Sequence, residues 1–153
     1  MILYRISRCN YINDLSGTGT RLFGGRWSSK GIPGLYLASS RALSVLEVLV
    51  HLQPVFIPDD YCLAEIEVTD NSVEIPDLSH LPANWAKVAP PHQLKYIGDS
   101  FLNAGKHLSF KLPSAIVPNE FNFLLNPLHS AMKKVHIVKQ EPFSFDERLI
   151  KQV

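Results

Sequence analysis

The sequence predicts one α+β domain, built on a bent or split, mainly antiparallel sheet with a few helices. Three observations favour this fold class. The apolar runs that resemble strands are short, and several are broken by proline, of which the chain has 11. Only two segments, 40–52 and 92–104, show a convincing helical pattern. Strands and helices do not alternate regularly, as they would in a parallel sheet with crossover helices.

The length of the chain fits a single domain. A chain of 153 residues buries about 68–70% of the surface that its unfolded form exposes, which is enough for one core. The sequence shows no internal repeat and no low-complexity segment. We therefore expect one domain spanning residues 1–153.

Charge and hydropathy exclude some classes of function. The net charge is +1, and the basic and acidic residues are interspersed, so direct nucleic-acid binding is disfavoured. No apolar run approaches the ~18 residues of a membrane span, and no signal peptide begins the chain. We expect a soluble, cytoplasmic protein.

The two cysteines argue against a metal site and a disulfide. Cys9 and Cys62 are far apart in the sequence and match no zinc-ligand spacing. We therefore expect neither a zinc site nor a disulfide framework, and a reducing compartment.

The first half of the chain begins with a strand and a long loop. Ile2–Ile6 alternates weakly and predicts a strand, in which Arg5 is the only charge and serves as an edge device or a ligand. Segment 7–21 has no regular period and predicts a loop of the length that is often functional. The apolar run Leu35–Ala38 predicts a short buried strand.

The helix predicted from Ser40 to Leu52 is apolar nearly all round, so we expect it to be buried. Its only polar stripe is Ser44, Glu47 and His51, which share one face. Two interpretations remain open: the stripe is solvated and Glu47 and His51 form an ordinary pair, or it faces a cleft. A metal site is a weaker interpretation, because no third ligand stands at a suitable spacing.

The second half predicts further scaffold. Segment 61–68 alternates as a half-exposed strand, and 71–91 predicts a surface excursion anchored by Trp85. The helix over 92–104 is expected to pack on the sheet and to end at Gly105. Further short strands are predicted around 108–112 and 135–138; the asparagines from 119 to 126 read as breaks, and Phe143, Phe145 and Leu149 are expected to close the chain against the core.

The loop over 23–31 is the strongest candidate for a functional site. Gly24 and Gly25 permit close approach of the backbone and place Arg26 beside Trp27, an arrangement typical of an anion and ring binder. Tyr36 and Glu47 follow on the next predicted strand and helix, so a guanidinium, a phenol and a carboxylate could converge. The alternative is a structural ion pair between Arg26 and Glu47, with Tyr36 in the core.

Ser114 is a further candidate. It follows Pro113, where the predicted strand breaks. A residue at such a bulge can turn its hydroxyl into a cleft, although a serine there is more often a hydrogen-bond partner of the backbone.

Taken together, these motifs resemble the RES domain family, and the resemblance covers essentially the whole chain. The family's arginine, glutamate and serine fall on Arg26, Glu47 and Ser114, with Tyr36 as the usual fourth site residue. One departure is Phe121, where many members carry a basic residue. The resemblance rests on Tyr4-Arg5, Gly24-Gly25-Arg26-Trp27 with Gly31, Tyr36, Leu46–His51, Pro113-Ser114 and Asn122–His129.

The resemblance implies the toxin of a RES-Xre toxin-antitoxin pair, with a fold similar to ADP-ribosyltransferase toxins and with NAD as substrate. No cofactor is expected, since NAD is consumed. Glu47 would stabilise an oxocarbenium-like state, Arg26 would contact the pyrophosphate or a ribose, and Tyr36 and Ser114 would hold the nicotinamide end. Arg5, Gly25 and Asn126 are the further NAD-binding residues that we expect.

Several functions remain open within this resemblance. We expect an NAD glycohydrolase, with a mono-ADP-ribosyltransferase or an NAD phosphorylase as alternatives, and a nucleotide-binding interaction module as the non-enzymatic one. A carboxylate on the helix favours an enzyme, because binding a dianionic dinucleotide gains nothing from a nearby negative charge. The partner expected besides NAD is an Xre-like helix-turn-helix antitoxin. A homodimer is compatible with the sequence, which shows no dedicated interface.

Overall fold

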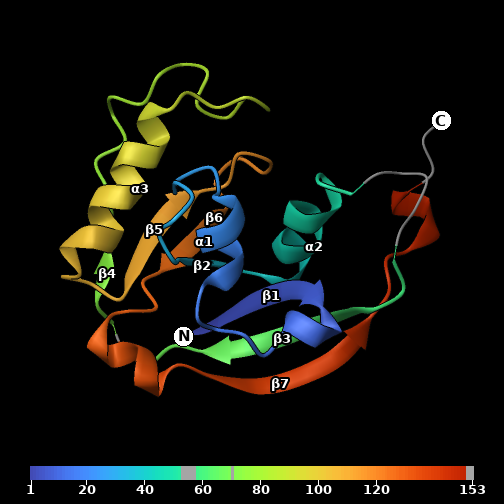
Figure 1. The fold of residues 1–153 in the computed structure, drawn as a ribbon. Helices are drawn as coiled ribbons and strands as arrows, with labels where there is room; N and C mark the ends of the chain where they lie inside the picture. Colours follow the sequence, from blue (N-terminus) through green and yellow to red (C-terminus); the bar gives the residue numbers. More distant parts are fainter. Residues whose placement is uncertain (53–57, 70, 151–153) are drawn as a thin grey trace.

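The computed structural model describes residues 1–52, 58–69 and 71–150 (Figure 1). Its strands are β1 (Ile2–Arg8), β2 (Leu35–Ala38), β3 (Tyr61–Glu67), β4 (Val73–Glu74), β5 (Ser109–Pro113), β6 (Phe121–Leu125) and β7 (His136–Phe143). Its helices are α1 (Thr18–Phe23), α2 (Arg41–Leu49) and α3 (Gln93–Ala104), with short 3₁₀ turns η1 (Cys9–Tyr11), η2 (Ser130–Lys134) and η3 (Glu147–Leu149).

The strands form one sheet in the order β4-β5-β6-β2-β1-β3-β7. Neighbouring strands are antiparallel throughout, except for the parallel pair β4 and β5. β1 meets β2 through the single register pair Tyr4 and Ala38, whereas β1 and β3 pair along their whole length. The β5-β6-β2 half therefore runs in a different direction from the β1-β3-β7 half (Figure 1). The predicted α+β fold with a bent, mainly antiparallel sheet is confirmed.

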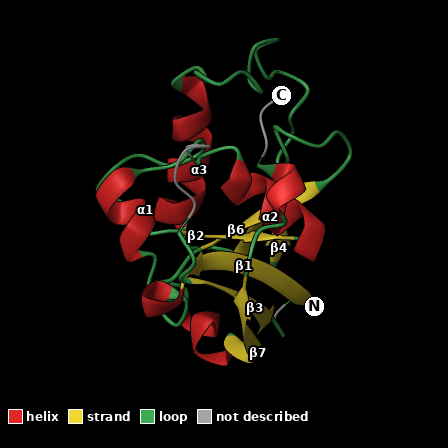
Figure 2. Ribbon diagram, turned by 90° about the vertical axis from the view of Figure 1, so that its right-hand side faces the viewer, coloured by secondary structure: helices red, strands yellow, loops and turns green. Residues whose placement is uncertain are grey.

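All three α-helices lie on one face of this sheet (Figure 2). The register aligns Tyr36, Leu124 and Phe110 on that face, where they pack with α3. Phe101 of α3 stacks on Phe110 with 4.6 Å between the ring centroids. α2 covers Ile6 of β1 in a separate cluster. The opposite face is closed by residues of η1 and η2.

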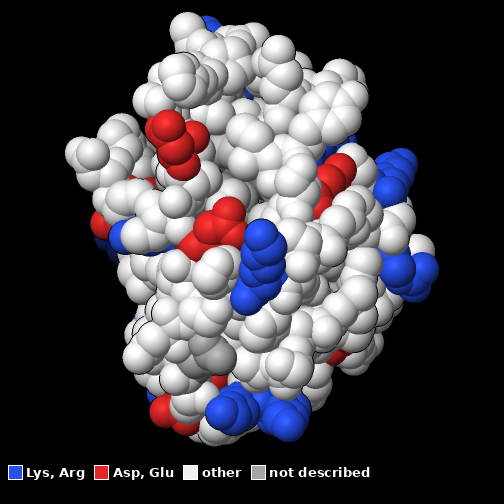
Figure 3. Space-filling view, turned by 90° about the vertical axis from the view of Figure 1, so that its left-hand side faces the viewer, with Lys and Arg blue, Asp and Glu red and all other residues white. Residues whose placement is uncertain are grey.

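Several predicted elements match the structure. β2 spans the predicted residues, and α3 ends at Gly105, which adopts φ 60° as a helix cap of this kind requires. Trp85 packs against the α3 cluster and so anchors the excursion over 71–91. No helix in the described part of the chain is long and apolar enough to cross a membrane. The face shown in Figure 3 carries acidic and basic side chains scattered among uncharged ones.

The elements that were not predicted include α1 and β6, besides the short strand β4 and the 3₁₀ turns. α1 lies in the segment expected to be a loop; it has six residues and contains no buried side chain, so it produces no apolar period. β6 lies where the asparagines indicated breaks, and it is a central strand between β5 and β2. Its buried residues Phe123, Leu124 and Leu125 are consecutive, as is usual for a strand covered on both faces.

The predicted burial of two segments is wrong. Only Leu43 and Ser44 of α2 are buried, because the helix packs on the sheet along one side. The helix also ends at Leu49, and Val50 is 55% exposed. At the end of the chain Phe145 is buried, but Leu149 is 50% exposed and does not close against the core.

The prediction of unpaired cysteines is also wrong, because Cys9 and Cys62 form a disulfide. The register of β1 and β3 places Ser7 opposite Cys62, and the backbone N–H of Cys9 donates to the carbonyl of Asp60 at 2.7 Å. Strand pairing therefore brings together cysteines that are 53 residues apart in the sequence. The inference of a reducing compartment loses its support.

Candidate active site

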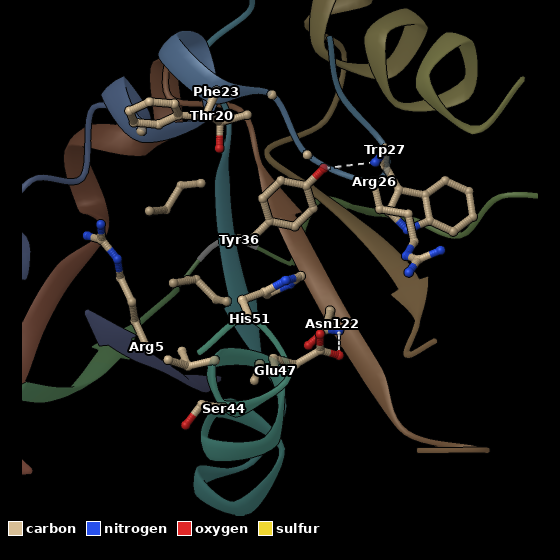
Figure 4. A pocket seen from close by; sticks show the side chains of 18 of the residues that line it. Arg5, Thr20, Phe23, Arg26, Trp27, Tyr36, Ser44, Glu47, His51 and Asn122 are labelled. Atoms are coloured by element: carbon tan, nitrogen blue, oxygen red, sulfur yellow. Dashed lines mark hydrogen bonds between the residues drawn. The ribbon is translucent and has the colours of Figure 1, made fainter. Parts of the chain in front are cut away.

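A cavity of about 810 Å³ opens on the helical face of the sheet, above the joint between β1 and β2. Its size is typical of small-molecule sites. Side chains from α1, the loop after it, β1, β2 and α2 surround it (Figure 4). Its lining includes Arg5, Thr20, Phe23, Arg26, Tyr36, Glu47, His51 and Asn122.

The glycine-rich loop forms a tight turn beside the cavity. The N–H of Gly25 donates to the carbonyl of Ser28 at 2.9 Å. A Cβ atom on Gly25 would lie 2.8 Å from the ring of Tyr36, so this predicted binding residue is needed for close packing. The carboxylate of Asp99 in α3 accepts hydrogen bonds from the N–H and hydroxyl of Ser29, at 2.8 and 2.6 Å. The turn is therefore fixed to a rigid helix.

Arg26 projects from this turn into the cavity wall. Its Nη1 donates to the carbonyls of Trp85 and Lys87, at 2.8 and 2.9 Å. These bonds hold the excursion over 71–91 against the turn. Trp27 is only 3% exposed and packs on Trp85, so the loop offers the guanidinium and not the indole to a ligand. Among the described residues no ion pair joins Arg26 to Glu47, which was the structural alternative.

Tyr36 extends from β2 into the middle of the cavity (Figure 4). Its hydroxyl accepts from the N–H of Trp27 at 3.2 Å and bonds the hydroxyl of Ser28 at 2.9 Å. Burial raises the pKa of Tyr36 to about 12. The phenol is therefore neutral at physiological pH and acts as an apolar ring with an engaged hydroxyl, and not as a base.

Glu47 extends from α2 into the cavity. Its Oε1 accepts from the hydroxyl of Ser114 at 2.9 Å and from the amide of Asn122 at 2.5 Å. No donor from the described residues reaches Oε2. The polar stripe on α2 thus faces the cleft, because Glu47 and His51 line the same cavity and form no ion pair with each other in the described structure.

The prediction that Ser114 turns its hydroxyl into the cleft is wrong, and the alternative, a hydrogen-bond partner of the backbone, is what the structure shows. Its hydroxyl donates to Glu47 and accepts from the N–H groups of Ile116 and Val117, each at 3.1 Å. It is 5% exposed and lies behind the cavity wall, whereas its neighbours Pro113 and Ala115 line the cavity. Ser114 therefore affects the cavity indirectly, by holding the carboxylate of Glu47 in place.

Arg5 and Asn126 differ in their positions. Arg5 lines the cavity, and its Nη1 donates to the carbonyls of Ile12 and Asp14, at 3.2 and 2.6 Å. Burial lowers the pKa of Arg5, and the nearby carboxylate of Asp14 opposes this shift. The ordinary pKa of an arginine is so high that the guanidinium remains charged. Asn126 does not line the cavity. Its amide donates to the carbonyl of Leu102 at 2.9 Å and ties the end of α3 to the chain after β6.

Sequence reasoning gave no role to Asn122, Thr20 or Phe23. Asn122 stands at the start of β6, opposite Ala38 and Leu112 in the register, which aims its amide at Glu47. Only the position of β6 in the sheet reveals this. At the departure noted for the family, the ammonium of Lys111 lies 4.0 Å from the centroid of the Phe121 ring. The described residues contain no cluster of three or more His, Cys, Asp or Glu placed to hold a metal ion.

The sequence profile of the RES domain matches residues 2–146, almost the whole chain. The chain belongs to the RES domain family. A protein named Toxin Res from Photorhabdus laumondii is 39% identical over 99% of this chain and 98% of its own length. A protein of the same name from Yersinia enterocolitica is 36% identical over 97% and 99%.

Two further comparisons concern a third relative and a solved structure. A Sphingobium protein named Prs ADP-ribosylating toxin is 36% identical over 92% of this chain and 89% of its own. The crystal structure of the M. tuberculosis MbcT-MbcA toxin-antitoxin complex contains a chain that superposes with a TM-score of 0.78. That match covers 97% of this chain and 86% of the other, and at 20% identity it shows a shared fold.

Proposed function

We propose that this RES protein is the toxin of a toxin-antitoxin pair and that it cleaves the bond between nicotinamide and ribose in NAD. The observation that carries the proposal is the carboxylate of Glu47. Two donors, Ser114 and Asn122, fix its Oε1 in place, while Oε2 has no partner among the described residues and is available to a ligand.

The chemistry explains why a fixed carboxylate matters. When the bond from ribose C1′ to the nicotinamide nitrogen breaks, its electron pair leaves with neutral nicotinamide and positive charge develops on the ribose. A carboxylate held beside the ribose stabilises that charge without reorganising at the moment of reaction. Water then adds to C1′ and loses a proton, which gives ADP-ribose. Asp14 also lines the cavity, but its carboxylate is engaged by Ser16, so Glu47 is the group that we assign to this role.

The remaining lining residues suit NAD as the substrate. The cationic Arg5 and Arg26 lie on opposite sides of Tyr36 in Figure 4 and can attract the two negative charges of the pyrophosphate. Nη1 of each arginine is held by carbonyl groups, so the guanidinium is positioned before the substrate arrives. The neutral ring of Tyr36 provides an apolar surface for the nicotinamide.

Transfer of ADP-ribose to a protein is the second candidate. It is favoured by the name of the Sphingobium relative, an ADP-ribosylating toxin that is 36% identical to this chain. Both functions, and phosphorolysis as well, share the cleavage step at Glu47 and differ only in what attacks C1′. We favour water as the acceptor and therefore a glycohydrolase.

The cleavage is tested by incubating purified protein with NAD and measuring nicotinamide. The parent should release nicotinamide, and Glu47→Gln should fold normally yet release it about 10²–10³-fold more slowly. Glu67→Gln is the matched control, because Glu67 lies on β3 in a surface pair with His136 and outside the cavity. No nicotinamide from the parent would contradict the proposal.

The acceptor is identified in the same reaction. The assay is run in phosphate-free buffer, with phosphate, and with cell extract, and the product that contains ADP-ribose is identified by mass spectrometry. Hydrolysis gives free ADP-ribose in all three. A phosphorylated ribose product or a modified protein would instead assign phosphorolysis or transfer.

A cognate antitoxin completes the proposal. The superposed chain comes from a toxin-antitoxin complex, and a near-neutral chain needs a partner if the pair is to bind DNA. We propose an Xre-like antitoxin with a helix-turn-helix, acting in the cytoplasm where NAD is consumed. Co-expression with the neighbouring gene product, followed by pull-down and sizing, should give an inactive complex. A toxin that stays active and unbound would contradict this part.

A further inference from the structure

Phe23 is an exposed aromatic side chain on the cavity wall. It is the last residue of α1, it is 76% exposed, and it lines the cavity. The phenol and indole side chains in the described lining, those of Tyr4, Trp27 and Tyr36, are buried or half-buried. Phe23 is therefore the exposed ring among the phenyl, phenol and indole side chains of the described lining.

The surroundings of Phe23 make this surface more than a single exposed apolar residue. Thr20 lies one turn earlier on α1, so its hydroxyl shares the face of Phe23 and also lines the cavity. Leu22 is 51% exposed on the same helix but does not line the cavity. Of the α1 residues, Thr18, Gly19, Thr20 and Phe23 line the cavity, and Thr20 and Phe23 together offer a hydroxyl and a ring.

Phe23 and Thr20 stand at the end of the cavity away from Glu47. In Figure 4, Tyr36 lies between the two ends, and Arg5 lies on the wall between Phe23 and Glu47. A ligand whose nicotinamide ribose meets Glu47 would extend past a cation toward α1. The order of groups along this path is carboxylate, guanidinium and aromatic ring.

We propose that Phe23 and Thr20 form the subsite for the adenine base of NAD. The proposal rests on the proposed function, since it takes the reacting ribose to lie at Glu47. Adenine is planar and stacks on an aromatic face, and its ring nitrogens and amino group can bond a hydroxyl that both donates and accepts. Arg5, which remains charged, is placed to meet the pyrophosphate between the two ends.

The opposite wall of the cavity provides the competing location. There the lining residues Val88, Pro90, His92 and Lys95 come from the excursion and the start of α3. His92 is exposed and is the one ring in this group that could stack on a base. Substituting Phe23 and His92 separately therefore distinguishes the two orientations of NAD.

The test measures binding, so that it does not depend on cleavage. Calorimetry on the Glu47→Gln protein gives the affinity for NAD, for AMP and for nicotinamide mononucleotide, which lacks the adenine. Adding Phe23→Ala should weaken NAD and AMP by on the order of tenfold and leave nicotinamide mononucleotide unchanged. Leu22→Ala and His92→Ala should change none of the three. Because Phe23 is exposed, its replacement should not alter thermal unfolding.

Several results would overturn the subsite. They are an unchanged affinity for NAD in Phe23→Ala, an equal loss for nicotinamide mononucleotide, and a selective loss of AMP binding in His92→Ala. Failure of the proposed function looks different, because the parent would then release no nicotinamide from NAD. A parent that cleaves NAD while Phe23→Ala binds it normally would refute the subsite alone.

Discussion

Replacing Asn122 tests whether the fixed position of Glu47 is what makes it effective. The amide of Asn122 supplies one of the two hydrogen bonds to Oε1 of Glu47, the other coming from Ser114. A hydrogen bond to a charged group contributes about 1.5–3 kcal/mol, which corresponds to a rate change of about 10–150-fold if all of it serves the transition state. Asn122→Ala should therefore lower kcat by about tenfold or more and change KM little.

Asn122→Asp should have a larger effect that depends on pH. It places a second carboxylate within hydrogen-bonding distance of Glu47, at the position of an amide that now lies 2.5 Å away. Two carboxylates so close cannot both ionise easily, so one pKa of the pair rises. Since the role proposed for Glu47 requires its ionised form, the rate of this variant should increase with pH more steeply than the parent rate.

The assay is nicotinamide release over pH 5–9, together with thermal unfolding. Asn103→Asp is the matched control, since Asn103 is exposed on α3 and does not line the cavity. A parent-like kcat in Asn122→Ala, or a flat pH profile in Asn122→Asp, would refute the argument that these hydrogen bonds position Glu47.

Three further predictions concern the scaffold. Gly98→Ala should lose about 1–3 kcal/mol or more of folding stability and unfold at a lower temperature, because its Cβ would lie 1.8 Å from the backbone oxygen of Trp27. Gly19→Ala should unfold like the parent, because its Cβ would meet nothing within 4 Å. The pKa of Tyr36 is about 12 in the folded state against an ordinary 10.0, so its contribution to folding stability is fully present below pH 10 and is lost as pH rises toward 12. Chemical unfolding over this pH range should therefore show a smaller loss of stability in Tyr36→Phe than in the parent. An equal loss in the two proteins would contradict the assignment. The disulfide between Cys9 and Cys62 spans 53 residues, so its reduction should cost about 4 kcal/mol of stability in a chain-entropy estimate; intact mass under non-reducing conditions should show two hydrogens fewer, and free thiols would contradict the pairing.

The parts of the fold that the sequence predicted are those decided by local pattern. β2 is a short apolar run with glycine before it, and α3 combines a helical period with a capping glycine at Gly105. Such features depend on residues within a few positions of one another. The same holds for the face of α2 that carries Glu47, because helical spacing alone puts Ser44, Glu47 and His51 together.

The parts that could not be predicted depend on contacts between distant segments. The period of α2 identifies a polar face but does not say whether a cavity or solvent lies in front of it. The pairing of Cys9 with Cys62 follows from the register of β1 and β3, and the role of Asn122 follows from the position of β6. α1 escaped detection because it buries no side chain, although it supplies Phe23 to the cavity.

The most direct test of the central claim is the rate of nicotinamide release from NAD by the parent protein and by Glu47→Gln, measured side by side. The account predicts that the parent releases nicotinamide and that the variant releases it about 10²–10³-fold more slowly. NAD binding should be weakened less than turnover. A parent that leaves NAD intact, or a Glu47→Gln variant that releases nicotinamide at the parent rate, would contradict it.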